Sequence, residues 1–77
     1  MSAKETLIDI VAEQLGLSSD EITPDSSLSR DLGADNLDKI ELILAVEEEF
    51  EIEIPNDEAS KLETVQGLLD FVNERLQ

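Results

Sequence analysis

Apolar residues recur at helical spacing in three stretches of the chain. The first stretch covers residues 3 to 16, and its apolar positions are Leu7, Ile8, Ile10, Val11 and Leu15. Intervals of three and four residues predict an amphipathic helix with one buried stripe. Gly16 follows directly, and a left-handed cap at this glycine would end the helix.

A second helix is predicted from Asn36 to Glu51. Its broad apolar face is formed by Leu37, Ile40, Ile43, Leu44, Val46 and Phe50. Acidic residues occupy the other positions: Asp38, Glu41, Glu48, Glu49 and Glu51. The Ile54-Pro55 pair ends this element, because the residue before a proline avoids helical backbone angles.

A short turn and a last helix complete the pattern. Residues 56 to 61 predict one helical turn, with Asn56 or Asp57 as its cap. Thr64 is expected to cap the last helix, which runs through Gln77. Its inward-facing residues are predicted to be Val65, Leu68, Leu69, Val72 and Leu76.

The segment between the first two long helices, LSSDEITPDSSLSRDLGAD, is rich in Ser, Asp, Pro and Gly and predicts a long loop. Ile22, Leu28 and Leu32 are the expected points of attachment to the core. No β-type alternation of sufficient length interrupts the helical pattern. The predicted fold class is all-α, a small four-helix bundle of three main helices and one short helix.

Length and composition restrict the chain further. Its 77 residues predict one domain, residues 1–77, of marginal stability. The absence of cysteine and histidine argues against disulfides and a structural zinc site. The N-terminal residues MSAKETLIDIV contain acids and no sustained apolar run, so neither a signal peptide nor a membrane anchor is predicted, and a cytoplasmic location is expected.

The net charge of -15 determines which partners are expected. Such a field repels nucleic-acid phosphates and anionic lipid, and it attracts proteins with basic patches. Because 40% of the residues are hydrophobic and fall in periodic groups, the acidity indicates a charged surface on a folded domain and not disorder. A monomer is the simplest expectation.

Eleven acids lie between Asp31 and Glu58, where Lys39 is the only base. They can be the solvated side of an amphipathic helix. Because like charges spaced by three or four residues oppose helix formation, docking to basic partners or weak divalent-cation binding are alternatives. The residues expected for weak cation binding are Asp35, Asp38, Glu47 and Glu53. An EF-hand loop starting at Asp31 is excluded, because glycine falls at loop position 3 and leucine at position 12.

Catalysis has little support in the sequence. His, Cys and Tyr are all absent, so the usual general bases and nucleophile partners are missing. Carboxylate pairs arise by chance in so acidic a chain. We predict that the protein is not an enzyme.

The segment DLGADNLDKIELILAVEEEFEIEIP resembles the central motif of acyl carrier proteins. In that family an Asp-Ser-Leu triplet opens the second helix after a Gly-Ala-Asp turn, and here the triplet is Asp35-Asn36-Leu37. The resemblance continues through the Leu15-Gly16-Leu17 and Ile22-Thr23 regions and through Thr64-Val65, so it spans essentially the whole chain. It implies a carrier of the bacterial type II fatty acid synthesis kind.

The family resemblance also implies which residues do what. The family's serine, here Asn36, is joined by a phosphodiester to 4'-phosphopantetheine, whose thiol carries acyl groups, and Asp35 and Leu37 flank it. Basic-surfaced fatty acid synthesis enzymes and a phosphopantetheinyl transferase would bind Asp35, Leu37, Asp38, Glu41, Leu44, Glu47 and Glu48. The acyl chain would withdraw into an interior lined by Ile40, Leu44, Val46, Phe50, Ile54, Leu62 and Leu68.

Elementary physics agrees with part of this reading. A flexible turn containing Gly33 delivers residue 36 to a helix N-terminus, where free N–H groups and the helix dipole favour a phosphate. Leu37 has two readings, an exposed apolar contact on an acidic surface or an ordinary core residue. Lys39 places a positive charge on the acidic helix and is expected to weaken docking to basic enzymes locally.

Asn36 departs from the family pattern. A carboxamide is a poor nucleophile and does not form a stable phosphodiester, whereas asparagine caps a helix as well as serine does. We therefore predict that the fold is kept and that this chain carries no covalent cofactor. None of the chain's serines stands in an Asp-Ser-Leu setting.

Two explanations of Asn36 remain: a substitution in a working carrier, which the intact neighbours favour, or a natural relative that abandoned carriage. The alternative functions are a non-carrier acidic interaction module and a carrier of another cargo, such as a polyketide, an amino acid or a lipid A precursor.

Overall fold

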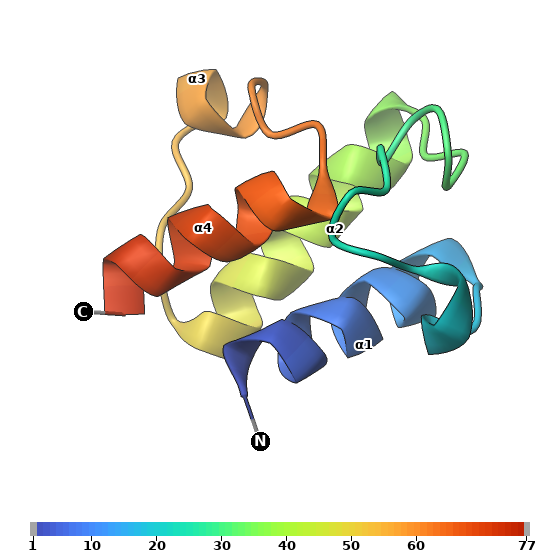
Figure 1. Cartoon of the computed structure of the whole chain (residues 1–77). Helices are drawn as coiled ribbons and strands as arrows, with labels where there is room; N and C mark the ends of the chain where they lie inside the picture. The colour runs from blue at the N-terminus through green and yellow to red at the C-terminus, as the bar shows by residue number, and fades with distance from the viewer. Residues whose placement is uncertain (1, 77) are drawn as a thin grey trace.

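The computed structural model describes residues 2–76 and is built from helices joined by loops (Figure 1). The long helices are α1 (Ala3–Leu15), α2 (Asn36–Phe50) and α4 (Val65–Leu76), and α3 (Asn56–Ala59) is a single turn. Helix α1 packs against both α2 and α4. Among residues 2–76 there is no regular strand, only one isolated bridge between Ser27 and Thr64. The predicted all-α, four-helix fold is confirmed.

Helix α1 forms as its sequence pattern predicts. The Ser2 hydroxyl caps its first turn by accepting from the Glu5 backbone N–H at 3.2 Å. Leu7 and Val11 are completely buried. Gly16 ends the helix at a φ of 69°, a left-handed conformation that glycine adopts without the steric cost of a Cβ atom.

The long loop between α1 and α2 is attached to the core where the sequence predicts. Ile22 and Leu28 are buried, and Leu32 is half-buried against the core. A 3-10 turn over Ser19–Glu21, which the sequence reading did not anticipate, shortens the irregular part. The loop is therefore ordered by its own hydrogen bonds and by apolar contacts.

The predicted apolar face of α2 is partly wrong. Leu42, which is not part of the predicted face, is completely buried together with Val46. Leu37, Ile40 and Leu44 are instead 63%, 58% and 56% exposed. Helix α2 has more apolar residues than one buried stripe can hold, and the partners available in α1 and the core accept the stripe of Leu42 and Val46. Leu37 is thus exposed, so the interpretation of it as a core residue is wrong, and its role as a contact stays a prediction.

The helix ends need two further corrections. Helix α3 begins after Pro55, its N-cap, so the caps predicted at Asn56 and Asp57 are wrong. Pro55 has a φ of -58° and an extended ψ of 148°, and its missing N–H costs no hydrogen bond at the start of a helix. Helix α2 ends at Phe50, and Glu51 is its left-handed C-cap.

Helix α4 confirms most of its prediction. The Thr64 hydroxyl accepts from the Gly67 backbone N–H at 3.0 Å and so caps the first turn. The inward residues Val65, Leu68, Leu69 and Val72 are buried. Leu76 is half-exposed, contrary to the prediction, because the last turn extends beyond the core. The predicted end at Gln77 lies outside the described residues.

Candidate functional site

Residue 36 occupies the first turn of α2 and is exposed. The helix is capped by Asp35 and not by Asn36. The Asp35 carboxylate accepts from the Asp38 N–H at 2.8 Å, and the Asp38 carboxylate accepts from the Asp35 N–H at 3.1 Å. This reciprocal capping box corrects the prediction that the asparagine is the cap. It leaves the Asn36 side chain free of any capping role.

The turn before α2 holds residue 36 at the surface. Gly33 adopts a φ of 73°, which bends the chain sharply. The next residue, Ala34, is buried, and its N–H donates to the Leu28 carbonyl at 2.8 Å. Ala34 therefore anchors the turn two residues before the exposed position.

A groove of about 550 Å³ starts beside residue 36 and runs between α2 and the α3 region. Its lining residues are Asn36, Lys39, Ile40, Ile43, Leu44, Glu47, Ile54, Asn56, Ala59 and Ser60. Five of these residues are apolar, and five are polar or charged. A site of this composition combines apolar contact area with several polar groups.

The predicted acyl-pocket residues lie in two different places. Ile40, Leu44 and Ile54 line the groove. Val46 and Leu68 are completely buried in the core, and Phe50 and Leu62 are half-buried against it. Ile40 and Leu44 are thus at an open surface of the protein and not in a closed interior.

The predicted partner-binding residues share one side of α2 only in part. Leu37 and Leu44 expose apolar surface, and Asp35, Glu41 and Glu48 are exposed acids nearby in the sequence. Asp38 is half-buried in the capping box. Glu47 differs, because its carboxylate accepts from the Ile54 N–H at 2.7 Å and so fixes the chain leading to α3.

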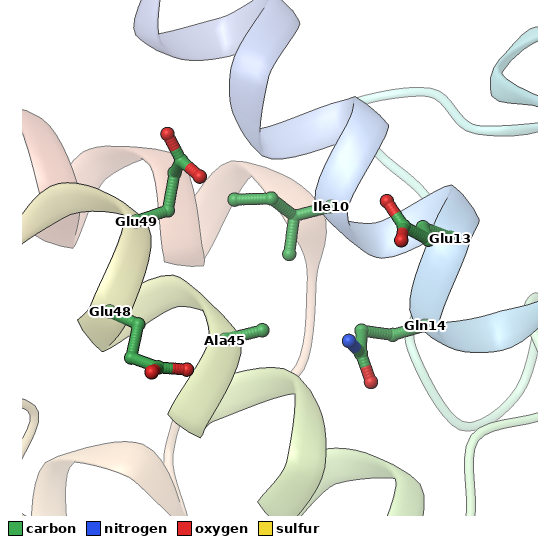
Figure 2. A pocket seen from close by; sticks show the side chains of 6 residues that line it. All are labelled: Ile10, Glu13, Gln14, Ala45, Glu48 and Glu49. Carbon is green, nitrogen blue, oxygen red and sulfur yellow. The ribbon is translucent and has the colours of Figure 1, made fainter.

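A second hollow, of about 280 Å³, lies between α1 and α2 (Figure 2). It is lined by Ile10, Glu13, Gln14, Ala45, Glu48 and Glu49. Among residues 2–76 no three acidic side chains converge into a group that could hold a metal ion. Of the residues predicted for weak cation binding, Asp35 and Asp38 cap α2 and Glu47 holds Ile54, so the structure does not bring them to one point with Glu53.

The carboxylate of Glu63 is a contact point that the sequence reading missed. It accepts from the Lys39 ammonium at 2.9 Å, from the Ser27 hydroxyl at 3.3 Å, and from the Ser29 hydroxyl and N–H. The Ser29 hydrogen bond, followed by the contact with Lys39, lowers the pKa of Glu63 from 4.5 to about 2. No periodic signal marks this residue, since its partners lie 24 to 36 positions away.

The part of the chain that the structure describes contains no helix long and apolar enough to cross a membrane.

Comparison with known proteins agrees with this geometry. Residues 5–72 match the family described as Phosphopantetheine attachment site. The fold is also similar to the solution structure of a protein assigned as an acyl carrier protein from Anaplasma phagocytophilum, with a TM-score of 0.86 and 28% identity over 96% of this chain and 88% of that chain. The chain therefore belongs to the phosphopantetheine attachment site family, as a carrier-type domain of the acyl carrier protein fold and not an enzyme.

Proposed function

We propose that this chain is an acyl carrier protein of the fatty acid synthesis kind, in a form that cannot take up its phosphopantetheine arm. The observation that carries the proposal is the place of residue 36, which is exposed in the first turn of α2 and lines a partly apolar groove. A tether attached there would reach both solvent and groove. The same place in the chain holds a carboxamide, which does not fit the attachment.

The misfit at residue 36 is chemical and not structural. The family's attachment needs a hydroxyl oxygen that attacks the phosphorus of coenzyme A. An amide nitrogen or oxygen is a poor nucleophile and gives no stable phosphodiester. Because Asp35 caps the helix, serine and asparagine are interchangeable at residue 36 as far as the fold is concerned.

The surface of α2 supports docking to basic enzymes. Exposed apolar side chains at Leu37 and Leu44 stand among acids, and a net charge of -15 attracts partners with Lys and Arg patches. Such docking is fast and weakens with salt. A cytoplasmic monomer is part of the proposal.

The test is phosphopantetheinylation of matched variants. The chain, Asn36→Ser and Asn36→Ala are incubated with coenzyme A and a phosphopantetheinyl transferase, and the intact mass of each is measured. Only Asn36→Ser is expected to gain one phosphopantetheine. A gain by the unaltered chain would refute the claim that it cannot be modified, and no gain by any variant would refute the carrier proposal.

The second candidate is a non-carrier acidic interaction module. The exposed Leu37, Ile40 and Leu44 on an acidic helix favour it, since apolar side chains at the surface often mark contacts with another protein. It is the better description if Asn36→Ser stays unmodified. If Asn36→Ser is modified, loading with fatty acyl, polyketide or aminoacyl groups decides among cargoes.

A further inference from the structure

The carboxylate of Glu63 joins segments that are far apart in the sequence. Glu63 lies in the linker between α3 and α4. Ser27 and Ser29 reach it from the loop before α2, and Lys39 reaches it from α2 itself. A backbone hydrogen bond joins the same loop to the linker, since the Leu28 N–H donates to the Glu63 carbonyl at 2.8 Å.

Glu63 is connected to residue 36 through hydrogen bonds in the loop before α2 and through Lys39 on α2. Along the loop, the carbonyl of Ser27 accepts from Asp31 at 3.0 Å and Leu32 at 3.1 Å, and the Leu28 carbonyl accepts from Ala34 at 2.8 Å. Along α2, Lys39 stands three residues after Asn36, which is about one helical turn, and both line the groove. The turn before residue 36 is thus fixed by contacts in the loop that precedes it and by Lys39 in the helix that follows it.

The Lys39–Glu63 pair differs from the other ion pair among the described residues. Arg75 and Glu58 are 3.2 Å apart, their side chains are 48% and 43% exposed, and they join α4 to α3 at the surface. The Lys39 side chain is 24% exposed and that of Glu63 is 45% exposed, so Glu63 is as open to solvent as Glu58, and its serine donors are what set it apart. Charge-assisted hydrogen bonds to several donors are stronger than one exposed ion pair.

We propose that Glu63 is a positioning residue, which fixes the turn before α2 and thereby the orientation of residue 36 beside the groove. Lys39 then stabilises the fold through its ion pair with Glu63. Because Glu63 neutralises its charge, Lys39 does not present a positive charge to a docking partner. The consequence for modification rests on the proposed function, whereas the consequence for the turn does not.

Amide hydrogen exchange on the unaltered chain and on Glu63→Gln tests the turn. We expect the amides of Asp31, Leu32 and Ala34 to exchange roughly threefold to tenfold faster in Glu63→Gln, since a charge-assisted contact that closes the turn is lost. Amides inside α1 should exchange faster only by the factor that the loss of global stability gives, which is smaller than the change in the turn. Glu58→Gln, which breaks the surface pair with Arg75, is the matched control and should leave the turn unaffected. Equal exchange in Glu63→Gln and the unaltered chain would overturn the proposal.

Modification kinetics test the presentation of residue 36. In the Asn36→Ser background, Glu63→Gln should lower kcat for phosphopantetheinyl transfer about threefold or more with little change in KM, because the docking side chains are intact. Glu63→Asp, which keeps the charge, should restore part of the rate. An unchanged kcat would overturn the role in presentation. If Asn36→Ser is not modified at all, the proposed function fails, and the exchange experiment still decides the role of Glu63.

Discussion

The side chain of residue 36 has a chemical role in the proposed function and no role in capping the helix. Asp35 and Asp38 satisfy the free N–H groups of the helix end, so the side chain at residue 36 contributes little to folding. Its identity is open to change without loss of the helix. Under the proposed function, a carboxamide here alters what the domain can attach and not how it folds.

Glu63 is the residue whose titration the structure predicts. Its pKa is lowered to about 2 in the folded chain, chiefly by the Ser29 hydrogen bond, from the 4.5 that applies when unfolded. A carboxyl group with a lowered pKa adds stability above about pH 4.5, and this is lost as the pH falls through about 2.

The free energy of unfolding should therefore fall in Glu63→Gln relative to the unaltered chain near neutral pH, and this difference should shrink toward pH 2. Urea unfolding of both chains at several pH values measures it. The other acids titrate in both chains and cancel in the comparison. A difference that stays constant with pH would contradict the lowered pKa.

At the scale of the element, α2 combines two functions on different sides. Leu42 and Val46 bind it to the core, whereas Leu37, Ile40 and Leu44 remain at the surface, where Ile40 and Leu44 line the groove. One helix thereby holds the fold together and also leaves large apolar side chains exposed to solvent. The two sets of residues can be altered independently.

The cap of α2 gives a direct prediction. Asp35→Ala should lower the free energy of unfolding by about 1 kcal/mol, because the Asp38 N–H loses its acceptor. Asn36→Ala should change it by no more than a few tenths of a kcal/mol. Urea unfolding measures both. An Asn36→Ala variant as unstable as Asp35→Ala would show that the asparagine caps the helix after all.

The two sides of α2 give a second prediction at this scale. Leu42→Ala should lower the free energy of unfolding by about 2–5 kcal/mol, since it opens a cavity in the core. Leu37→Ala removes similar atoms from an exposed site and should change stability by less than about 0.5 kcal/mol. Chemical denaturation compares the two variants. Similar losses in both would contradict the orientation of α2.

For the whole molecule, repulsion among the acidic side chains opposes the compact folded state. Twenty acids and five bases share a fold with a radius of gyration of 11.1 Å. Only two ion pairs lie within residues 2–76, so most acids are not neutralised by a neighbouring base. Repulsion among them lowers the stability of a domain that is already small.

Salt should consequently stabilise the chain. Raising NaCl from low to moderate concentration is expected to raise Tm by roughly 5 °C, which corresponds to about 1 kcal/mol for a domain of this size. Thermal unfolding followed by circular dichroism measures the shift. Magnesium and calcium should act in the same direction. A Tm that is independent of salt would show that the acids are too dispersed to matter.

The helices, and the position at which the proposed function places the attachment, follow from the amino-acid sequence without the structure. Local signals specify these features: apolar spacing in α1 and α4, the cap at Thr64, the glycine at residue 16, and the Gly-Ala-Asp turn before residue 36. Each depends on residues a few positions apart, so periodicity and motif are enough to find it.

Tertiary structure alone decided which side of α2 is buried and what holds the turn before it. Helix α2 has apolar residues around most of its surface, so its own sequence does not select Leu42 over Leu37, and the shape of the core does. Glu63 acquires its role only when folding brings Ser27, Ser29 and Lys39 to it from 24 to 36 residues away. Contacts over that distance leave no periodic trace in the chain, because they depend on how the helices pack.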